Sequence, residues 1–263
     1  MDQQPAAPQN VVQVNFALAL SGGQLSATVQ VPAGPSNLVQ ILPLLRGLDD
    51  AFIDDAASEL AAAGQPISCK QGCNHCCYQA VPISLVEAEA LAEWIRTLPE
   101  DQQQELARRF RETILKLSAA GLTENLDHMV PNGPGEAAVK LAFDYLYLRI
   151  PCPFLEDGAC SIYAIRPFAC REYLVTSAPE HCFDPGTRQV KGVQLPRRFF
   201  TLLKESATEA DETARGWIPL VFLFDWMEAG SHFNQTGSAT GPEVLYDFLQ
   251  RMSTPKPPAH PDA

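Results

Sequence analysis

Half of the eight cysteines in this chain fall within nine consecutive residues. The segment reads CKQGCNHCC and contains Cys69, Cys73, Cys76 and Cys77. Thiols at such short spacing have few uses: they bind metal, or they pack as small hydrophobic side chains. The fold must therefore either build a thiol site around this segment or bury it.

The spacing of these cysteines supports three interpretations. Cys69, Cys73 and Cys76 have a C-x3-C-x2-C spacing that resembles the cluster motif of radical S-adenosylmethionine enzymes. Cys73 and Cys76 also form the C-x2-C pair typical of zinc sites. On a helix, by contrast, the four cysteines would form an ordinary buried stripe. A radical-enzyme barrel needs about six or more strand–helix units, and because no such succession follows Cys77, the first interpretation is weakened.

The remaining cysteines lie in residues 152–182, which read CPFLEDGACSIYAIRPFACREYLVTSAPEHC. Seven, nine and eleven residues separate them, and these are loop spacings rather than zinc-knuckle spacings. Asp157-Gly158 predicts a tight turn, and in a regular hairpin Leu155 rather than Cys152 would lie opposite Cys160. We therefore expect an irregular, loop-rich segment.

Eight thiols suit either two four-cysteine sites or one cluster with four ligands and four spare cysteines. The second segment has no C-x2-C pair, so two zinc ribbons are disfavoured. An iron–sulfur cluster tolerates irregular spacing because it presents several iron atoms to the chain. Arg166 and Arg171 flank Cys170 and would neutralise a negatively charged cluster, or else pair with Glu172 and other acids at the surface. His75 and His181 are expected to be turn residues rather than ligands.

Charge and hydrophobicity restrict the partners and the compartment. The chain has 19 basic and 31 acidic residues, a net charge of −12, and no Lys/Arg run longer than two. We therefore expect no binding to nucleic acid or to an anionic membrane. The first ten residues lack a basic signal-peptide start, and no apolar run approaches the roughly 20 residues of a membrane span. We expect a cytoplasmic protein, in which thiols stay reduced.

Hydrophobic periodicity predicts a mainly α (α+β) fold, with two loop-rich cysteine segments and a small N-terminal β-hairpin. Residues 12–20 and 24–31 alternate as strands around Ser21-Gly22-Gly23. A helical stripe follows over residues 38–60, with Ser36 as the expected cap and Gly64 as the terminator. Ser84 and Glu87 form a capping box, and we expect later helices at 100–120, 196–203, 217–227 and 242–252. Residues 136–150 fit a helix in their first half and a strand in their last turn, and the pattern does not fix where one would end.

These elements predict five segments along the chain. They are a disordered N-terminus (1–10), a β-hairpin and helix (11–64), a cysteine-cluster metal-binding domain (65–192), C-terminal helices packed on it (193–252) and a disordered tail (253–263).

The segments SCKQGCNHCC and CPFLEDGACSIYAIRPFACREY together resemble the YkgJ-type cysteine-cluster family, which is described as a zinc- or iron-chelating domain. The resemblance covers roughly residues 66–184. It implies that the eight cysteines form the ligand set, most of them metal-binding. It leaves open whether the metal is an iron–sulfur cluster, in the 4Fe-4S form, or zinc. The implied ligands are Cys69, Cys73, Cys76, Cys77, Cys152, Cys160, Cys170 and Cys182.

The same family is similar to the flagellin lysine N-methylase FliB, in which an iron–sulfur cluster and S-adenosylmethionine serve methyl transfer to protein lysines. The resemblance thus implies a metal-binding cysteine-cluster protein or, alternatively, a protein-lysine N-methylase with a flagellin-like substrate. A zinc-stabilised protein-interaction module is a third interpretation. No GxGxxG follows a strand, so S-adenosylmethionine would bind an open cluster iron or lie near Arg166 and Arg171. No catalytic residue can be named from the sequence.

Overall fold

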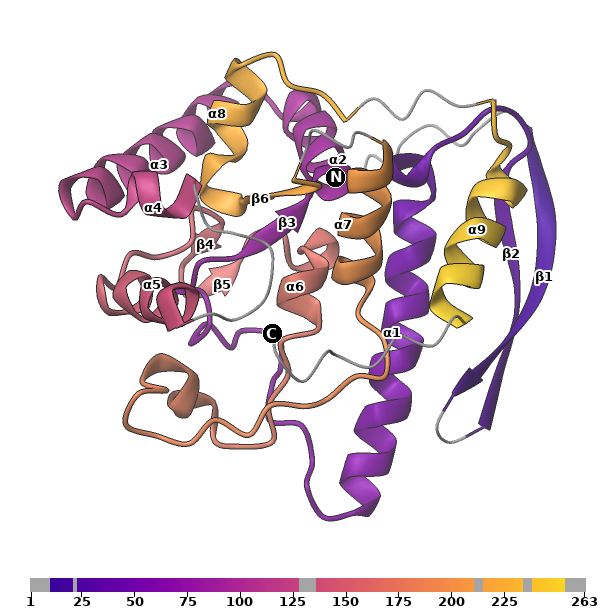
Figure 1. Ribbon diagram of the computed structural model, residues 1–263, viewed down its shortest axis with the longest axis horizontal. Helices are drawn as coiled ribbons and strands as arrows, with labels where there is room; N and C mark the ends of the chain where they lie inside the picture. The colour runs from indigo at the N-terminus through magenta and orange to yellow at the C-terminus, as the bar shows by residue number, and fades with distance from the viewer. Residues whose placement is uncertain (1–9, 21–22, 128–135, 211–214, 234–237, 254–263) are drawn as a thin grey trace.

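The computed structural model describes residues 10–20, 23–127, 136–210, 215–233 and 238–253 (Figure 1). The predicted hairpin turn at Ser21 and Gly22 lies outside these residues, as do most of the two ends that were predicted to be disordered.

Helices form most of the regular structure, and three small antiparallel sheets of two strands each complete it within the described ranges. The predicted mainly α (α+β) class is therefore confirmed. In chain order the elements are β1 (Val11–Leu20), β2 (Gly23–Pro32), α1 (Leu38–Ala62), β3 (Pro82–Ser84), α2 (Leu85–Thr97), α3 (Glu100–Ala119), α4 (Thr123–Asp127), α5 (Glu136–Tyr147), β4 (Leu155–Glu156), β5 (Ala159–Cys160), η1 (Tyr163–Ile165), α6 (Phe168–Arg171), η2 (Pro179–Phe183), α7 (Phe199–Ala210), β6 (Trp217–Pro219), η3 (Leu220–Phe222), α8 (Leu223–Glu228) and α9 (Gly241–Ser253).

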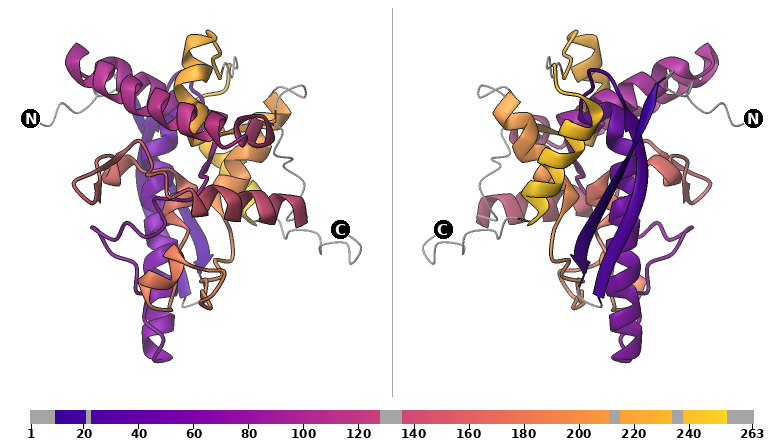
Figure 2. Two further views of the ribbon diagram at one scale, coloured as in Figure 1. Left: turned by 90° about the vertical axis from the view of Figure 1, so that its left-hand side faces the viewer. Right: turned by 90° about the vertical axis from the view of Figure 1, so that its right-hand side faces the viewer.

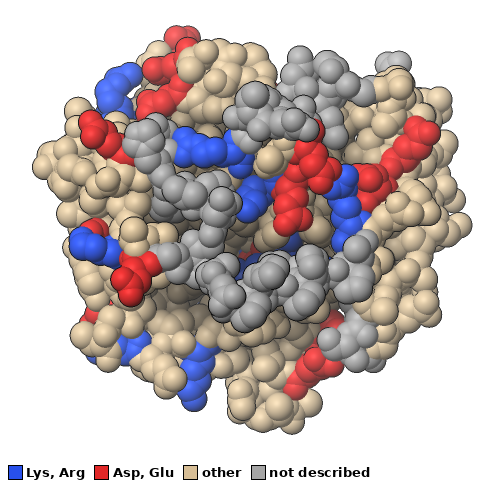
Figure 3. All heavy atoms as spheres, in the orientation of Figure 1, with Lys and Arg blue, Asp and Glu red and all other residues tan. Residues whose placement is uncertain are grey.

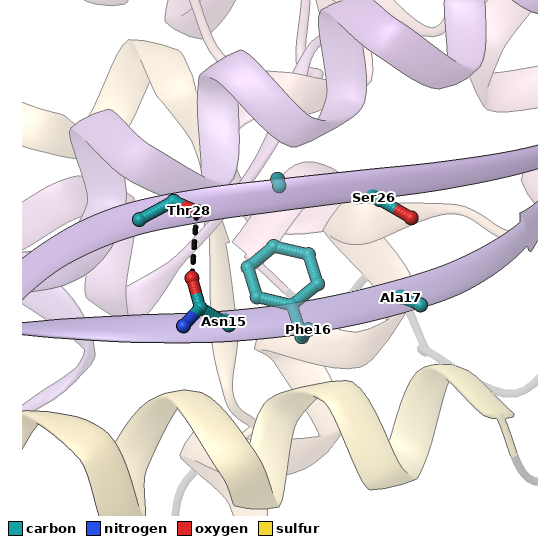
Figure 4. A pocket seen from close by; sticks show the side chains of 6 residues that line it. Asn15, Phe16, Ala17, Ser26 and Thr28 are labelled. Carbon is teal, nitrogen blue, oxygen red and sulfur yellow. Dashed lines mark hydrogen bonds between the residues drawn. The ribbon is translucent and has the colours of Figure 1, made fainter.

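The N-terminal hairpin is confirmed, with β1 and β2 paired residue for residue from Val11↔Pro32 to Leu20↔Gly23. Alternation places Leu18 and Val31 in the core, while Asn15 and Ala17 face solvent. The hairpin lies across α1 and α9, as the right-hand view of Figure 2 shows. A shallow hollow of about 510 Å³ opens on it, where Thr28 donates a hydrogen bond to Asn15 (Figure 4). No titratable side chain lines this hollow.

Helix α1 is capped by Asn37. The cap expected from the sequence, Ser36, is therefore wrong. The Asn37 side chain accepts a hydrogen bond from the Gln40 amide at 3.2 Å, and the Gln40 side chain accepts one from the Asn37 amide at 2.9 Å. The Ser36 hydroxyl instead donates to the carbonyl of Gly34. The reciprocal pair wins because it satisfies two free amides, whereas a lone serine satisfies one.

The helix predicted at residues 217–227 is only partly correct. Trp217–Pro219 is the strand β6, which pairs with β3, and the chain turns helical only at Leu220. Pro219 lacks an amide hydrogen and suits the end of a short strand better than the interior of a helix. Over residues 136–150, where the sequence left helix and strand open, the helix α5 runs to Tyr147 and the chain then turns without forming a strand.

Three hydrophobic clusters hold the described elements together. The first joins α1, β2, α7 and α9 and includes Phe168 of α6, the second joins α2, α3, β3 and η3, and the third joins α3, α4, α5 and η3. Cys152 and Cys160 pack against the second cluster. These contacts connect elements from several of the predicted segments, whose boundaries stay predictions.

The charged surface is mixed on the face drawn in Figure 3, where acidic and basic side chains are interspersed and several of them touch. Among the described residues, no helix is both long and apolar enough to cross a bilayer. The expectation that the chain binds neither nucleic acid nor a membrane surface stays a prediction.

Candidate metal centre

The first cysteine segment is a pair of tight turns rather than a helix. The amide of Cys73 donates to the carbonyl of Lys70, and the amide of Cys77 donates to the carbonyl of Asn74, both at 3.0 Å. Gly72, the third residue of the first turn, has φ +85°, a left-handed conformation that favours glycine. The interpretation of these cysteines as a helical stripe is therefore wrong.

Cys69 is held between backbone segments far apart in sequence. The amide of Ser68 donates to the carbonyl of Val175 at 2.9 Å, and the amide of Val175 donates to Sγ of Cys69 at 3.4 Å. An amide that points at sulfur stabilises a thiolate, which is the form that binds metal. This contact brings the first cysteine segment beside the second.

A second backbone contact joins the two segments at Cys77 and Cys152. The amide of Cys152 donates to the carbonyl of Cys77 at 2.7 Å. Nearby, the side-chain amide of Asn74 donates to the carbonyl of Gly158 at 3.1 Å, which ties the β4–β5 hairpin to the first segment. Leu155 lies opposite Cys160 in that hairpin, as the Asp157-Gly158 turn predicted.

Cys170 and Cys182 lie on short helical turns. Cys170 is in α6 and Cys182 is in η2, where it is buried, whereas the other seven thiols are partly exposed. None of the eight forms a disulfide. The second cysteine region is therefore the irregular, loop-rich segment that its spacing predicted.

The thiols interact electrostatically around Cys76. A hydrogen bond from the Cys77 thiol lowers the pKa of Cys76 to about 7, whereas burial raises the pKa of Cys152 and of Cys182 to about 12. The pKa of six other thiols is raised mainly by burial or by a hydrogen bond, and a negative charge on Cys76 raises it further. Those six are Cys69, Cys77, Cys152, Cys160, Cys170 and Cys182.

The thiols lie near one another, but their arrangement does not match the ligands of a single metal ion. In the part of the chain that the structure describes, no three Cys, His, Asp or Glu side chains stand at the separation that a single metal ion requires. The assignment of the eight cysteines as ligands therefore stays a prediction. The donor chemistry fits a thiolate-bound metal, because every candidate is a reduced thiol and one already accepts an amide hydrogen bond.

The two arginines predicted to lie near the cluster occupy different environments. Arg171 is 5% exposed and pairs with Asp49 at 3.2 Å and with Asp50, so that it connects α6 to α1. The Arg166 guanidinium lies 4.2 Å from the centre of the Tyr163 ring. Its charge opposes the burial that raises the pKa of Cys160 and of Cys170. Arg166 is therefore the cation that faces the thiols, with Tyr163 as its stacking partner.

The Nε atom of Arg166 is buried and has no hydrogen-bond partner among the described residues. A buried donor without a partner is costly, and in native proteins it calls for an explanation such as a bound ion. An acceptor beside Cys160 and Cys170 would satisfy it.

Glu87 positions the helix that carries Cys170. It is 1% exposed and accepts hydrogen bonds from the amide and hydroxyl of Ser84, at 2.9 and 2.7 Å, which confirms the predicted capping box. Its other oxygen accepts from the Phe168 amide at 2.7 Å, at the first residue of α6. One carboxylate thus caps two helices, a role that local sequence could reveal only in part.

Buried Asp49 makes the stability of the fold depend on pH. Burial raises the pKa of Asp49 from 3.8 to about 7, although Arg171 opposes the shift. Between about pH 4 and pH 7 the folded chain therefore holds a proton that the unfolded chain has lost, and its contribution to the free energy of unfolding falls as pH rises. We expect Asp49→Asn to flatten this dependence, measured by chemical denaturation at pH 4.5, 6 and 7.5.

The exposed Asp54 on the same helix supplies the control. Asp54→Asn should leave the pH dependence of the wild type unchanged. Parallel curves for Asp49→Asn and the wild type would contradict this role of Asp49.

The two histidines of the cysteine segments make contacts of their own. His75 packs edge-on against Phe183, with ring centres 6.3 Å apart, and Nδ1 of His181 lies 2.8 Å from the carbonyl oxygen of Gln189. Their expected role as turn residues rather than ligands stays a prediction. A second hollow, of about 460 Å³, lies next to Cys69 and is bounded by residues 64–68, 176–178 and Lys191.

Comparison with known proteins bears on the cysteine region alone. The family model "CxxCxxCC: Putative zinc- or iron-chelating domain" matches residues 68–190, a span that contains all eight cysteines. Neither the curated proteins nor the solved structures gave a match to this chain. The match supports metal binding by this part of the chain and leaves zinc and iron as alternatives.

Proposed function

We propose that this chain is a metal-binding protein whose converging thiols hold an iron–sulfur cluster of the 4Fe-4S type. The observation that carries the proposal is the pair of backbone contacts, from Ser68 to Val175 and from Cys152 to Cys77, that bring thiols of both cysteine segments together. A 4Fe-4S cluster and a tetrahedral zinc ion each take four thiolates, so the number of thiols does not separate them. The irregular spacing of the second cysteine segment favours the cluster, because a cluster presents several iron atoms to the chain. When bound, such a cluster supplies electron transfer or an iron with an open coordination position.

The surroundings of the thiols also favour a cluster. The Val175 amide donates to Cys69, and the Arg166 charge lies among Cys160, Cys170 and Cys76. Amide hydrogen bonds to sulfur and nearby charge are the features by which proteins tune iron–sulfur clusters. A solvated zinc site has less need of them.

Anaerobic purification followed by iron, acid-labile sulfide and zinc analysis tests the proposal. We expect brown protein with about four iron and four sulfide per chain. Colourless protein with one zinc per chain would replace the proposal with a structural zinc site, as in a zinc-stabilised interaction module. Protein without metal after anaerobic reconstitution would overturn it.

Arg166→Gln tests the electrostatic environment of the cluster. Loss of a positive charge near the thiols should make the cluster harder to reduce, lowering its potential by tens of millivolts at an effective dielectric of about 20. Arg188→Gln, at an exposed position in the Cys182 loop, is the matched control and should leave the potential unchanged. Redox titration followed by electron paramagnetic resonance gives the measurement, and equal potentials in both variants would contradict a role for Arg166.

A second candidate function is S-adenosylmethionine-dependent methylation of protein lysines, with a flagellin-like substrate. The unpartnered Nε of Arg166 favours it, because the carboxylate of S-adenosylmethionine would satisfy this donor beside the cluster. Calorimetric titration of anaerobically purified protein with S-adenosylmethionine tests it. Binding heat that is lost in Arg166→Gln would support this candidate, and the absence of heat and of any spectral change would exclude it.

A further inference from the structure

Aromatic side chains surround a guanidinium beside the cysteines. The Arg149 guanidinium carbon lies 3.7 Å from the centre of the Phe183 ring and 5.5 Å from that of Tyr147. Tyr78 and His75 pack edge-on against Phe183, at centre-to-centre distances of 5.2 and 6.3 Å. We call His75, Tyr78, Tyr147 and Phe183 the aromatic clamp.

Three separate segments build the aromatic clamp, and each is fixed independently. The Tyr147 hydroxyl donates to Asp184 at 3.3 Å, and the backbone of Gly186 passes so close that a Cβ there would lie 2.2 Å from the same oxygen. His75 and Tyr78 are fixed by the turns of the first cysteine segment, and Phe183 directly follows Cys182. The clamp is therefore assembled by the same loops that carry the thiols.

Arg149 occupies the aromatic clamp without an ionic partner. Its Nη1 atom donates to the carbonyl of Phe183, and no carboxylate pairs with it in the residues that the structure describes. Its backbone has φ +54°, the left-handed conformation that commonly ends a helix, and here it lies just after the last residue of α5.

Exposed apolar side chains lie on and after the helix that ends at the aromatic clamp. Helix α5 ends at the clamp, and Val139, Tyr147 and Leu148 on and after this helix are 43%, 47% and 38% exposed. The chain as a whole carries a net charge of −12, which attracts basic partners over a distance. The exposed apolar residues, the rings that bind a cation and the net negative charge of the chain together favour the binding of a basic segment of another protein.

We propose that the aromatic clamp binds an arginine side chain of a partner protein and that Arg149 fills the same position while the partner is absent. The guanidinium of Arg149 displays the geometry that the ligand would adopt, with its face on Phe183 and a donor directed at the Phe183 carbonyl. Stacking of a planar guanidinium on aromatic faces favours arginine over lysine at such a position. The partner arginine would displace the Arg149 side chain from the aromatic clamp.

The test uses full-length protein of measured metal content and the probe N-acetyl-L-arginine amide, with the uncharged isostere N-acetyl-L-citrulline amide as control. Binding is followed by nuclear magnetic resonance of the histidine and tyrosine rings. We expect Arg149→Ala to bind the arginine probe at least about fivefold more tightly than the wild type, and the citrulline probe no more tightly. Arg149→Ala combined with Phe183→Leu should lose this gain.

Two results would overturn the proposal. One is equal affinity of Arg149→Ala and the wild type for the arginine probe, and the other is equal affinity for arginine and citrulline. If Arg149→Ala fails to fold, Arg149→Met keeps most of the side-chain volume without the charge, and the same comparisons apply to it. Because metal content is measured on the same samples, failure of the metal site and failure of the aromatic clamp are separate results.

Discussion

Cys76→Ser is expected to remove nearly all bound metal from the chain. The Cys76 thiol has the lowest pKa of those that shift, so it is the first to become a thiolate, and its charge reaches six of the other seven thiols. A serine hydroxyl is a poor ligand for iron or zinc in a site made of thiolates. We expect the metal content after anaerobic reconstitution to fall to about a tenth of the wild-type value or less, since removal of one ligand leaves the core incompletely coordinated.

Lys70→Ala provides the matched control for this substitution. Lys70 lies in the same pair of turns and is exposed, and only its backbone carbonyl takes part in a turn. The Lys70→Ala protein should retain the full metal content of the wild type. Cys76→Ser protein with wild-type iron or zinc content would show that Cys76 is not a ligand. Cys77→Ser tests the role of Cys77 by the same measurement: metal is lost if Cys77 is a ligand, and is kept if Cys77 serves only as the hydrogen-bond donor to Cys76.

Glu87→Ala should cause a large loss of stability. The buried carboxylate accepts hydrogen bonds from Ser84 and Phe168, and alanine would leave those donors without partners in the core. Buried hydrogen bonds to such groups are worth about 1.5–3 kcal/mol each, so we expect a decrease of about 3–5 kcal/mol in the free energy of unfolding. Urea denaturation followed by circular dichroism measures it.

Two further variants show whether the loss arises from capping. Glu87→Gln keeps one acceptor oxygen and should lose less stability than Glu87→Ala. Glu93→Ala removes an exposed carboxylate from the same helix and should change the free energy of unfolding by no more than about 0.5 kcal/mol. An equal effect of Glu87→Ala and Glu93→Ala would refute the double-capping role.

Periodicity in the sequence was sufficient to predict most helices and the N-terminal hairpin, because each of these elements has a buried face with a regular repeat. The Ser84–Glu87 capping box and the Asp157-Gly158 turn were also predictable, since both are local patterns. Strand β3 was not, because three residues are too few to display a repeat and its partner lies about 135 residues away in β6.

The environment of the candidate metal centre could be read from the sequence only in part. The cysteines and Arg166 are conspicuous in their segments, but the ion pair of Arg171 with Asp49 joins residues 122 positions apart. The contact of Glu87 with Phe168 spans 81 positions. Neither has a local signal, because both depend on how α1 and α2 pack against α6.

The contacts between the two cysteine segments also set an order of events in folding. Ser68 and Val175 are separated by 107 positions, so their pairing closes a very long loop. Contacts of such long range form slowly, because the chain loses much of its freedom before they give any stabilisation. The helices can form from local contacts first, and the thiols come together late. The newly made chain therefore passes through a stage in which its helices are present while its cysteines are still far apart and open to oxidation or to the wrong metal.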